Sequence, residues 1–271
     1  MNRSLRLGLA PVFCFLLIFG LGAIWVNTSV SLSQTNGGFG LSQYGRIFLD
    51  TYYLTIIVQT FVFGFVVTAV CALLGYPMAF AFARSEGRFK VVILFFVVTP
   101  LLVNVVVRSF GWMVILGPGG AINGALRALG FGRIELMYNW FGVTLALAHV
   151  LLPFMIISTA GGIQAIDRRL EEAAGLLGAS PSQCFLRITL PLSLEGLTTG
   201  CILCFTLAIG SFVTVMLLGN ETTMIMPTLI YQQLTVGADW PFAAAMGTIL
   251  LIIVVSVLWL QARFQRKGRA Q

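Results

Sequence analysis

The chain has 271 residues, of which 58% are hydrophobic and only 9% are charged, and its mean hydropathy is +0.97. A soluble domain carries about a quarter charged residues, so this composition excludes an ordinary globular protein and indicates an integral membrane protein. The formal net charge of +7 would suit a nucleic-acid-binding protein, but the charges cluster between apolar stretches, as topology signals do. We therefore expect a lipid bilayer and no nucleic acid as the chain's surroundings.

Apolar stretches that are long enough to cross a bilayer, which takes about 20 residues, recur along the chain. They predict an all-α integral membrane protein with one transmembrane domain over residues 1–271. We expect six spans, at residues 7–30, 52–83, 91–107, 140–161, 197–218 and 242–260. The first stretch could be a signal peptide, but it is too long for one and Ala23-Ile24-Trp25 is a poor cleavage site. We predict that it is an uncleaved first helix.

Two intervals between the spans carry further signals. Residues 108–139 are rich in glycine and include Gly117-Pro118-Gly119-Gly120, which predicts turns in a loop. A phosphate cradle is a weak alternative, because neither lysine of the chain, Lys90 or Lys267, follows a glycine. The chain therefore lacks a Walker A motif and is not expected to be an enzyme. In the interval 220–241, the stretch Met226 to Leu234 predicts a short re-entrant or interfacial helix.

The basic residues predict the orientation, because lysine and arginine favour cytoplasmic loops. Six spans place both termini on one side of the membrane. Twelve of the 16 basic residues fall on that side, and these are Arg3, Arg6, Arg84, Arg88, Lys90, Arg168, Arg169, Arg187, Arg263, Arg266, Lys267 and Arg269. The other four are Arg46, Arg108, Arg127 and Arg133. We expect both termini and the loop 162–196 in the cytoplasm.

The loop 162–196 predicts two short helices with a break between them. Glu171 and Glu172 suit the first turn of a helix, where acidic side chains offset the helix dipole. Gly178 is a typical C-terminal stop. Ser180-Pro181 then starts a second helix, because serine is a good N-cap and proline fits the first helical position. We expect Pro191 to end or kink that second helix.

The same loop resembles a known signature. Glu172-Ala173-Ala174, then Gly178, Ile188 and Leu190-Pro191, at fixed gaps, are similar to the EAA motif of ABC-importer permeases. An ordinary amphipathic surface hairpin is the alternative. The resemblance implies a type I importer in the bacterial inner membrane, in which the loop docks into an ATPase. It implies as partners two ABC ATPase subunits that bind ATP and Mg²⁺, a second permease subunit that is identical or homologous, and a soluble substrate-binding protein.

The resemblance also implies which residues couple the chain to the ATPase. The candidates are Glu172, Ala173, Ala174, Leu177, Gly178, Ala179, Ser180, Phe185, Ile188, Leu190 and Pro191. We expect Ala173, Ala174, Leu177 and Phe185 to make the contact. We expect Leu190-Pro191 to pack within the permease, and Glu172 to cap its helix or pair with Arg168 or Arg169.

Other segments resemble the spermidine/putrescine-type permease subfamily. They are Arg108-Ser109-Phe110-Gly111-Trp112, Gly120-Ala121-Ile122-Asn123, His149 with Pro153-Phe154, and Gly210-Ser211-Phe212. The resemblance implies a polyamine substrate. An opine, an amino-acid-like solute or another zwitterionic or anionic small molecule is the alternative, because no Asp or Glu lies in the middle of a span to attract a polycation.

Polar or aromatic groups in or near spans are candidates for the translocation path. We select Asn104, Arg108, Trp112, His149, Ser211, Phe212, Thr214 and Tyr231. For His149, the only histidine, a structural role is favoured over substrate contact. For Trp112, a place in the aromatic belt of the membrane and a role as a substrate gate both stay open.

Three other protein classes fit less well. A secondary transporter usually has duplicated halves and intramembrane ionisable relays, and neither is evident here. A membrane enzyme needs a catalytic constellation, and one histidine without an intramembrane acid offers none; no metal site is predicted either. A membrane scaffold would not need the spaced Glu-Ala-Ala to Leu-Pro loop.

Overall fold

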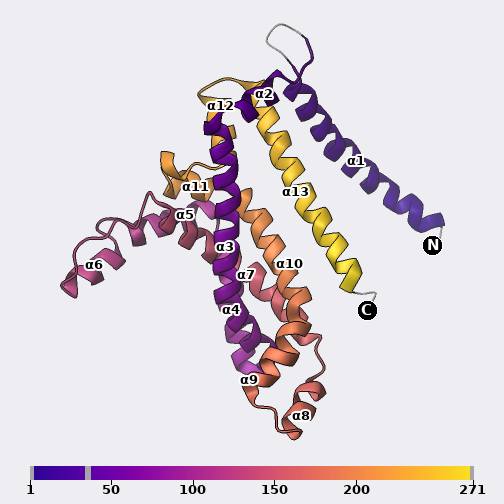
Figure 1. Ribbon diagram of the computed structural model, residues 1–271, viewed down its shortest axis with the longest axis vertical. Coiled ribbons are helices and arrows are strands. Elements are labelled where there is room, and N and C mark those ends of the chain that lie inside the picture. The colour runs from indigo at the N-terminus through magenta and orange to yellow at the C-terminus, as the bar shows by residue number, and fades with distance from the viewer. Residues whose placement is uncertain (1–2, 34–37, 269–271) are drawn as a thin grey trace. The chain divides into compact units, whose positions relative to one another are not determined.

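The computed structural model describes residues 3–33 and 38–268 (Figure 1). Residues 1–2 and 269–271, which belong to the basic ends counted above, lie outside the described residues. The regular structure in the described part is helical, apart from one isolated antiparallel bridge between Ser33 and Phe39. Six of the described helical stretches are long and apolar enough to cross a membrane. The all-α prediction with six transmembrane helices is confirmed.

The chain forms two compact units, residues 1–57 with 226–253 and residues 58–225 with 254–271. The first unit holds α1 (Arg3–Ser31), α2 (Ser42–Leu49), the start of α3 (Thr51–Arg84), α12 (Met226–Thr235) and the start of α13 (Trp240–Gly268). Helix α12 confirms the short helix predicted in the interval 220–241.

Polar contacts join distant segments within the first unit. Arg46 Nη1 lies 2.8 Å from Asp239 Oδ2, and the Arg46 guanidinium lies 4.4 Å from the centre of the Phe242 ring. The Asn27 amide donates to Thr248 Oγ1 at 2.9 Å. These contacts hold α2 and α1 against α13.

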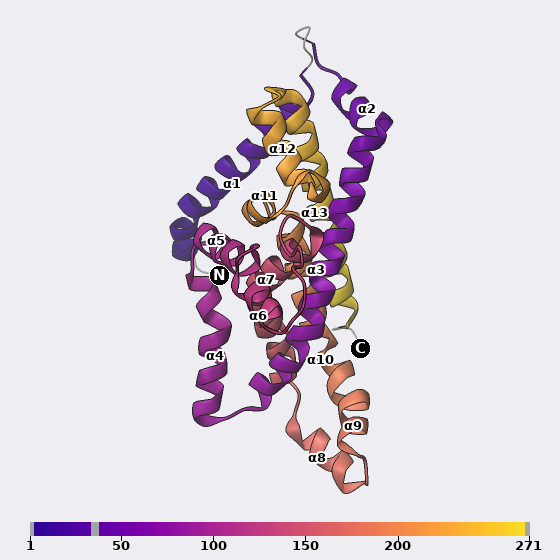
Figure 2. The same ribbon diagram turned by 90° about the vertical axis from the view of Figure 1, so that its left-hand side faces the viewer.

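The second unit contains the rest of α3 and a run of helices in which α7 and α10 are the longest. These are α4 (Gly87–Leu102), α5 (Val105–Leu116), α6 (Ala121–Ala128), α7 (Trp140–Gln164), α8 (Arg168–Leu176), α9 (Pro181–Cys184), the π-helical segment η1 (Phe185–Thr189), α10 (Leu190–Ile209) and α11 (Val213–Leu218). Figure 2 shows α8 and α9 together at the end of α10.

Small residues let α7 and α10 approach closely. Ser158 Oγ donates to the Gly196 carbonyl at 3.1 Å, and a Cβ on Gly162 would lie 2.9 Å from the Gly196 Cα. A Cβ on Gly200 would lie 2.8 Å from the sulfur of Met155. Lipid is as apolar as the helix surfaces and gives no hydrophobic driving force for their association, so membrane helices associate through such close packing.

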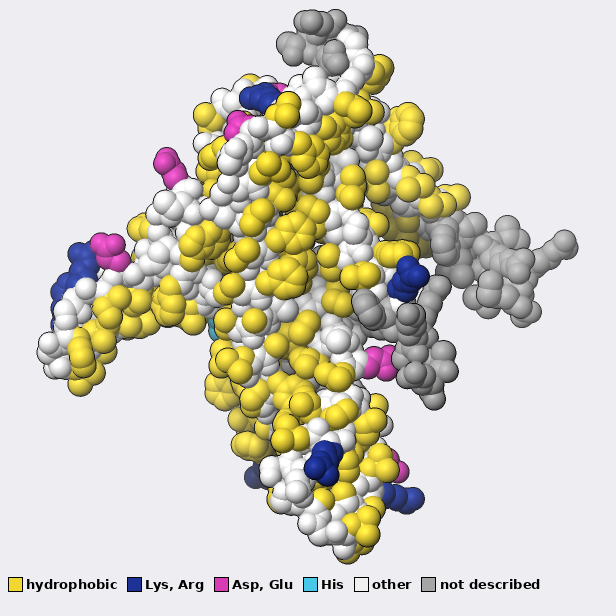
Figure 3. Space-filling view, viewed as in Figure 1, with side chains coloured by type: hydrophobic (Ala, Val, Ile, Leu, Met, Phe, Trp, Pro, Cys, Tyr) yellow, Lys and Arg dark blue, Asp and Glu magenta, His cyan; other side chains and the backbone are white. Residues whose placement is uncertain are grey.

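The outer faces of the second unit are apolar, as lipid requires. Phe65 and Leu73 of α3 are 64% and 76% exposed. Hydrophobic side chains, drawn in yellow, cover long stretches of the visible surface along α3 and α10 (Figure 3).

The predicted span 91–107 differs from the helices that form. Helix α4 ends at Leu102, and α5 starts at Val105. Asn104 caps α5, because its side-chain oxygen accepts from the Val106 N–H at 2.8 Å. Arg108 Nη1 donates to the carbonyl of Pro100, near the end of α4. These polar groups supply hydrogen bonds to the backbone groups that are left without a helical partner where α4 ends and α5 begins.

The interval 108–139 was expected to be a loop, and this is wrong for its first part, which forms α5 and α6. The predicted turn between them is confirmed, because the Gly120 N–H donates to the Gly117 carbonyl at 2.9 Å. Residues 129–139 then lead to α7 without regular structure.

The predicted span 197–218 also differs, because α10 begins at Leu190 and ends at Ile209. A break at residues 210–212 separates it from α11. The expectation that Pro191 could end the helix is wrong, because α10 continues from Leu190 through Pro191 to Ile209. Proline lacks an N–H and its ring meets the carbonyl four residues earlier. The π-helical turn η1, closed by the Leu190 N–H on the Phe185 carbonyl, accommodates it.

Candidate functional site

Helix α8 has well-formed caps at both ends. Asp167 caps its start, with a side-chain oxygen that accepts from the Arg169 N–H at 3.0 Å. At its end Gly178 has a φ of +86°. The Ala179 N–H donates to the Ala174 carbonyl and the Gly178 N–H to the Gly175 carbonyl, both at 3.0 Å. These two bonds form a Schellman motif, which confirms the predicted stop at Gly178.

Helix α9 begins as predicted at Ser180-Pro181. The Ser180 hydroxyl accepts from the Gln183 N–H at 3.3 Å. The Gln183 side chain accepts from the Ser180 N–H at 3.0 Å. This reciprocal pair is a capping box. The α8–α9 loop, residues 165–184, therefore has a defined backbone rather than a loose one.

The tip of the α8–α9 loop exposes large apolar side chains. Leu176 and Leu177 are 90% and 89% exposed. Figure 1 shows α8 and α9 beyond the end of α10, away from the packed part of the second unit. These two leucines lie at the tip of a loop that also carries polar caps and ion pairs.

The predicted coupling residues divide into an outward and an inward group. Those on the outside are Glu172, Ala173, Leu177, Gly178, Ser180 and Pro191, and those half-buried are Ala174, Ala179, Phe185, Ile188 and Leu190. The Phe185 ring packs edge-on at 5.7 Å from both Tyr76 and Phe80 of α3. Leu190 packs against the same cluster of α3 and α7, as expected, whereas Pro191 is exposed and the expectation is wrong for it. Phe185 thus serves the packing of this chain.

The acidic residue that forms an ion pair is Glu171, not Glu172. Glu171 Oε1 accepts from the Arg84 guanidinium and from Thr189 Oγ1, the latter at 2.7 Å. The expected cap or ion pair of Glu172 is not found: Asp167 caps α8, Arg168 Nη1 lies 3.0 Å from Glu86 Oε1, and no ion pair joins Glu172 to Arg169 in the described residues. Glu172 remains exposed.

Trp112 and His149 meet in the second unit. The Trp112 indole N–H donates to His149 Nδ1 at 3.4 Å, and the two rings are nearly perpendicular, with centres 5.5 Å apart. Both side chains are half-buried. The structure therefore joins two predicted path residues from α5 and α7, and it gives His149 the structural partner that was expected.

The other predicted path residues are only partly brought together. Thr214 is buried, and its hydroxyl accepts from Ser109 Oγ at 3.5 Å, which links α11 to α5. Ser211 and Phe212 lie in the break before α11. Tyr231 belongs to α12 of the other unit and is 41% exposed. Asn104 and Arg108 serve the break between α4 and α5.

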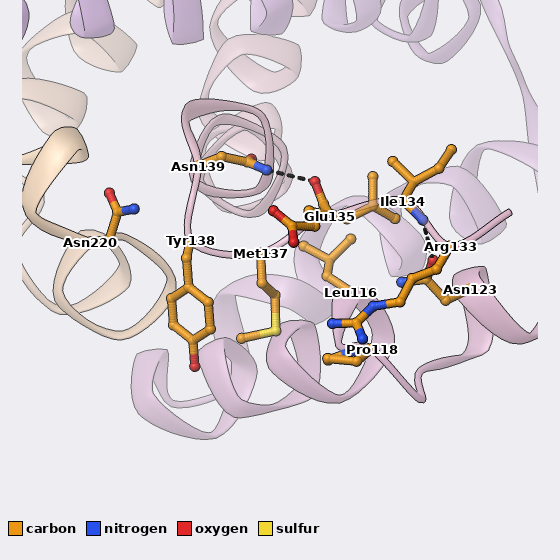
Figure 4. Close-up of a pocket in the computed structure, with 11 residues that line it drawn as sticks. Leu116, Pro118, Asn123, Arg133, Ile134, Glu135, Met137, Tyr138, Asn139 and Asn220 are labelled. Atoms are coloured by element: carbon orange, nitrogen blue, oxygen red, sulfur yellow. Dashed lines mark hydrogen bonds between the residues drawn. The ribbon is translucent and has the colours of Figure 1, made fainter.

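A polar cavity of about 260 Å³ that the sequence analysis did not select lies beside residues 133–139 (Figure 4). Asn123 closes one side, since it accepts from the Ile134 N–H and donates to the Gly117 carbonyl, each at 3.0 Å. Asn139 donates to the Glu135 carbonyl at 2.7 Å. Asn123 stands in a segment singled out above, but its sequence gave no sign of a cavity.

The described residues include no group of three or more His, Cys, Asp or Glu side chains that could hold a metal ion. The described residues instead form an exposed apolar tip at Leu176 and Leu177 and a set of polar contacts between helices.

Comparison with known proteins assigns the family. The model of the family described as binding-protein-dependent transport system inner membrane component matches residues 72–269. The spermidine/putrescine transport system permease protein PotB of Escherichia coli is 32% identical over 234 residues, 84% of this chain and 85% of that protein. The molybdenum transport system permease protein ModB of Mycobacterium tuberculosis is 34% identical over 194 residues, 70% of this chain and 71% of that protein.

A solved structure has the same fold. It is a bacterial alginate ABC transporter in complex with an alginate pentasaccharide-bound periplasmic protein, with a TM-score of 0.80 and 20% identity, covering 97% of this chain and 94% of that chain. The chain therefore belongs to the binding-protein-dependent transport system inner membrane components, the permease subunits of ABC importers, and is a multi-pass protein of the inner membrane.

Proposed function

We propose that this permease imports a polyamine such as spermidine or putrescine, and that its α8–α9 loop seats an ATPase in the cytoplasm. Two ATPase subunits that bind ATP and Mg²⁺, a second permease subunit and a soluble binding protein would complete the importer. Both termini would lie in the cytoplasm, as the excess of basic residues on that side favours.

The exposure of Leu176 and Leu177 carries the coupling part of the proposal. About 90% of each side chain is free at the end of a helix whose two caps leave its backbone little freedom. Full burial of an exposed leucine side chain contributes about 1.5–3 kcal/mol of favourable free energy. Two leucines can therefore anchor a contact in a cleft of the ATPase. A capped helix transmits a displacement instead of absorbing it.

The similarity to PotB of E. coli supports a polyamine. The half-buried indole of Trp112 offers an aromatic face, which attracts an organic cation.

An oxyanion is the second candidate, favoured by the 34% identity to a molybdenum permease. Transport assays separate the two. Proteoliposomes that contain the assembled importer and its binding protein should take up labelled spermidine, and excess molybdate should not compete. Molybdate uptake without spermidine uptake would replace the polyamine assignment and leave the coupling assignment intact.

Co-purification tests the docking surface. A tagged Leu177→Asp variant should lose the ATPase that accompanies the wild-type chain. Leu129→Asp is the matched control, since Leu129 is 72% exposed outside the α8–α9 loop. Equal ATPase recovery with both variants would refute the docking assignment.

A further inference from the structure

The carboxylate of Glu171 joins three elements at one point. It accepts a hydrogen bond from Arg84, the last residue of α3, and another from Thr189, the residue before α10. Glu171 itself lies in α8, which bears the exposed leucines. One oxygen, Oε1, takes part in both contacts.

This cluster, Arg84–Glu171–Thr189, is more enclosed than the neighbouring ion pair. The side chains of Arg84 and Glu171 are 17% and 23% exposed, and Thr189 is 2% exposed. Arg168 and Glu86 join α8 to the start of α4, but they are 50% and 78% exposed. Exposed pairs contribute little, whereas loss of one partner from an enclosed pair leaves a charge without compensation.

The cluster lies at the other end of α8 from the contact surface. Leu177 lies six positions after Glu171, which is about 9 Å along a helix. Glu171 therefore offers a side-chain route from Leu177 to α3 and α10, beside the covalent route to α10 through α9 and η1. The other contacts of α8 on this path are weaker, for instance the Cys184 thiol on the Glu171 carbonyl at 3.8 Å.

We infer that Arg84, Glu171 and Thr189 are positioning residues that transmit ATPase movement from α8 to the membrane helices α3 and α10. The inference rests on the proposed function of the α8–α9 loop. It assigns the transmission step to residues outside the motif that resembles the EAA signature, since Glu171 precedes that motif and Arg84 lies 87 positions earlier.

Hydrogen–deuterium exchange on the importer purified with its ATPase tests this without knowledge of the solute. ATP with vanadate should change amide exchange in α8 and in residues 78–84 of α3 in the wild-type complex. In Glu171→Gln and Arg84→Gln, the α8 response should persist while the α3 response falls about threefold or more. Thr189→Val, which keeps the shape without the hydroxyl, should have a smaller effect of the same sign.

The control variants are Glu86→Gln and Arg168→Gln, which break the exposed pair between α8 and the start of α4 and should leave both responses unchanged. A cluster that only stabilises the fold would lower both responses in proportion. That result, or a wild-type complex whose α3 does not respond, would overturn the inference and leave the proposed docking intact. A wild-type chain that binds no ATPase would overturn both.

Discussion

Gly162 and Gly196 meet backbone to backbone where α7 and α10 pack together. A Cβ on Gly162 would lie 2.9 Å from the Gly196 Cα, and one on Gly196 would lie 2.8 Å from the Ser158 carbonyl oxygen. Neither neighbour is a flexible side chain that could move aside. The two long helices that form the core of the second unit thus depend on the absence of side chains at these two positions.

Alanine at either glycine should therefore separate the helices. We expect Gly162→Ala and Gly196→Ala each to lower the free energy of unfolding by about 1–3 kcal/mol, the usual effect of overpacking. Thermal unfolding of the purified protein in mild detergent measures this. The control is Gly161→Ala, because a Cβ at Gly161 meets nothing within 4 Å; equal stability of all three variants would contradict the packing.

Asparagine at position 178 should preserve ATPase binding better than alanine does. Its φ of +86° is in the left-handed region, where an ordinary L-residue costs about 1–2 kcal/mol and asparagine is tolerated more readily. Gly178→Ala should lower ATPase co-purification, Gly178→Asn should do so less, and Gly178→Asp should uncouple transport without affecting membrane insertion. Gly175→Ala, inside the same helix, should preserve α8; a comparable loss there would argue against the cap as the cause.

Asn104 should stabilise the break between α4 and α5. Asn104→Ala removes the acceptor of the Val106 N–H and should cost about 1 kcal/mol, while Asn104→Ser, another good N-cap, should cost much less. Unfolding midpoints in detergent compare the two. If serine proved no better than alanine, the cap would not be the reason for asparagine at this position.

Spermidine transport should depend more on the aromatic ring of Trp112 than on its indole N–H. Trp112→Phe removes the bond to His149 but keeps an aromatic face for a cation, whereas Trp112→Leu removes both. Cation–π attraction of about 0.5–2 kcal/mol predicts a KM for spermidine that rises about 2- to 30-fold in the leucine variant. Trp25→Leu is the control, as Trp25 is 75% exposed in α1. An unchanged KM in Trp112→Leu would remove Trp112 from the path.

Local chemistry made part of the loop predictable. The stop at Gly178 and the start at Ser180-Pro181 each depend on residues within one or two helical turns, and both were predicted. The break at Asn104 depends on equally local capping, but the apolar residues on both sides of it hid the break within a predicted span. Hydropathy alone finds apolar stretches and misses a polar cap that divides one of them.

Long-range packing accounts for the rest. Glu171 and Glu172 are adjacent, and only the direction of α8 relative to α3 decides which one reaches Arg84. Likewise, Phe185 is as apolar as Leu177, yet it packs against Tyr76, more than 100 positions earlier. No periodicity within the loop could reveal which apolar side chains the chain would bury for itself and which it would leave for a partner.

The most direct test of the account is photo-crosslinking from position 177 in the native membrane. A photoreactive phenylalanine analogue at Leu177 should capture a P-loop ATPase, identified by mass spectrometry, while the same analogue at Leu129 should not. This result would place the exposed tip of α8 against the subunit that hydrolyses ATP. Capture of the ATPase from position 129 but not from position 177, or from neither, would contradict the assignment of the α8–α9 loop as the coupling element.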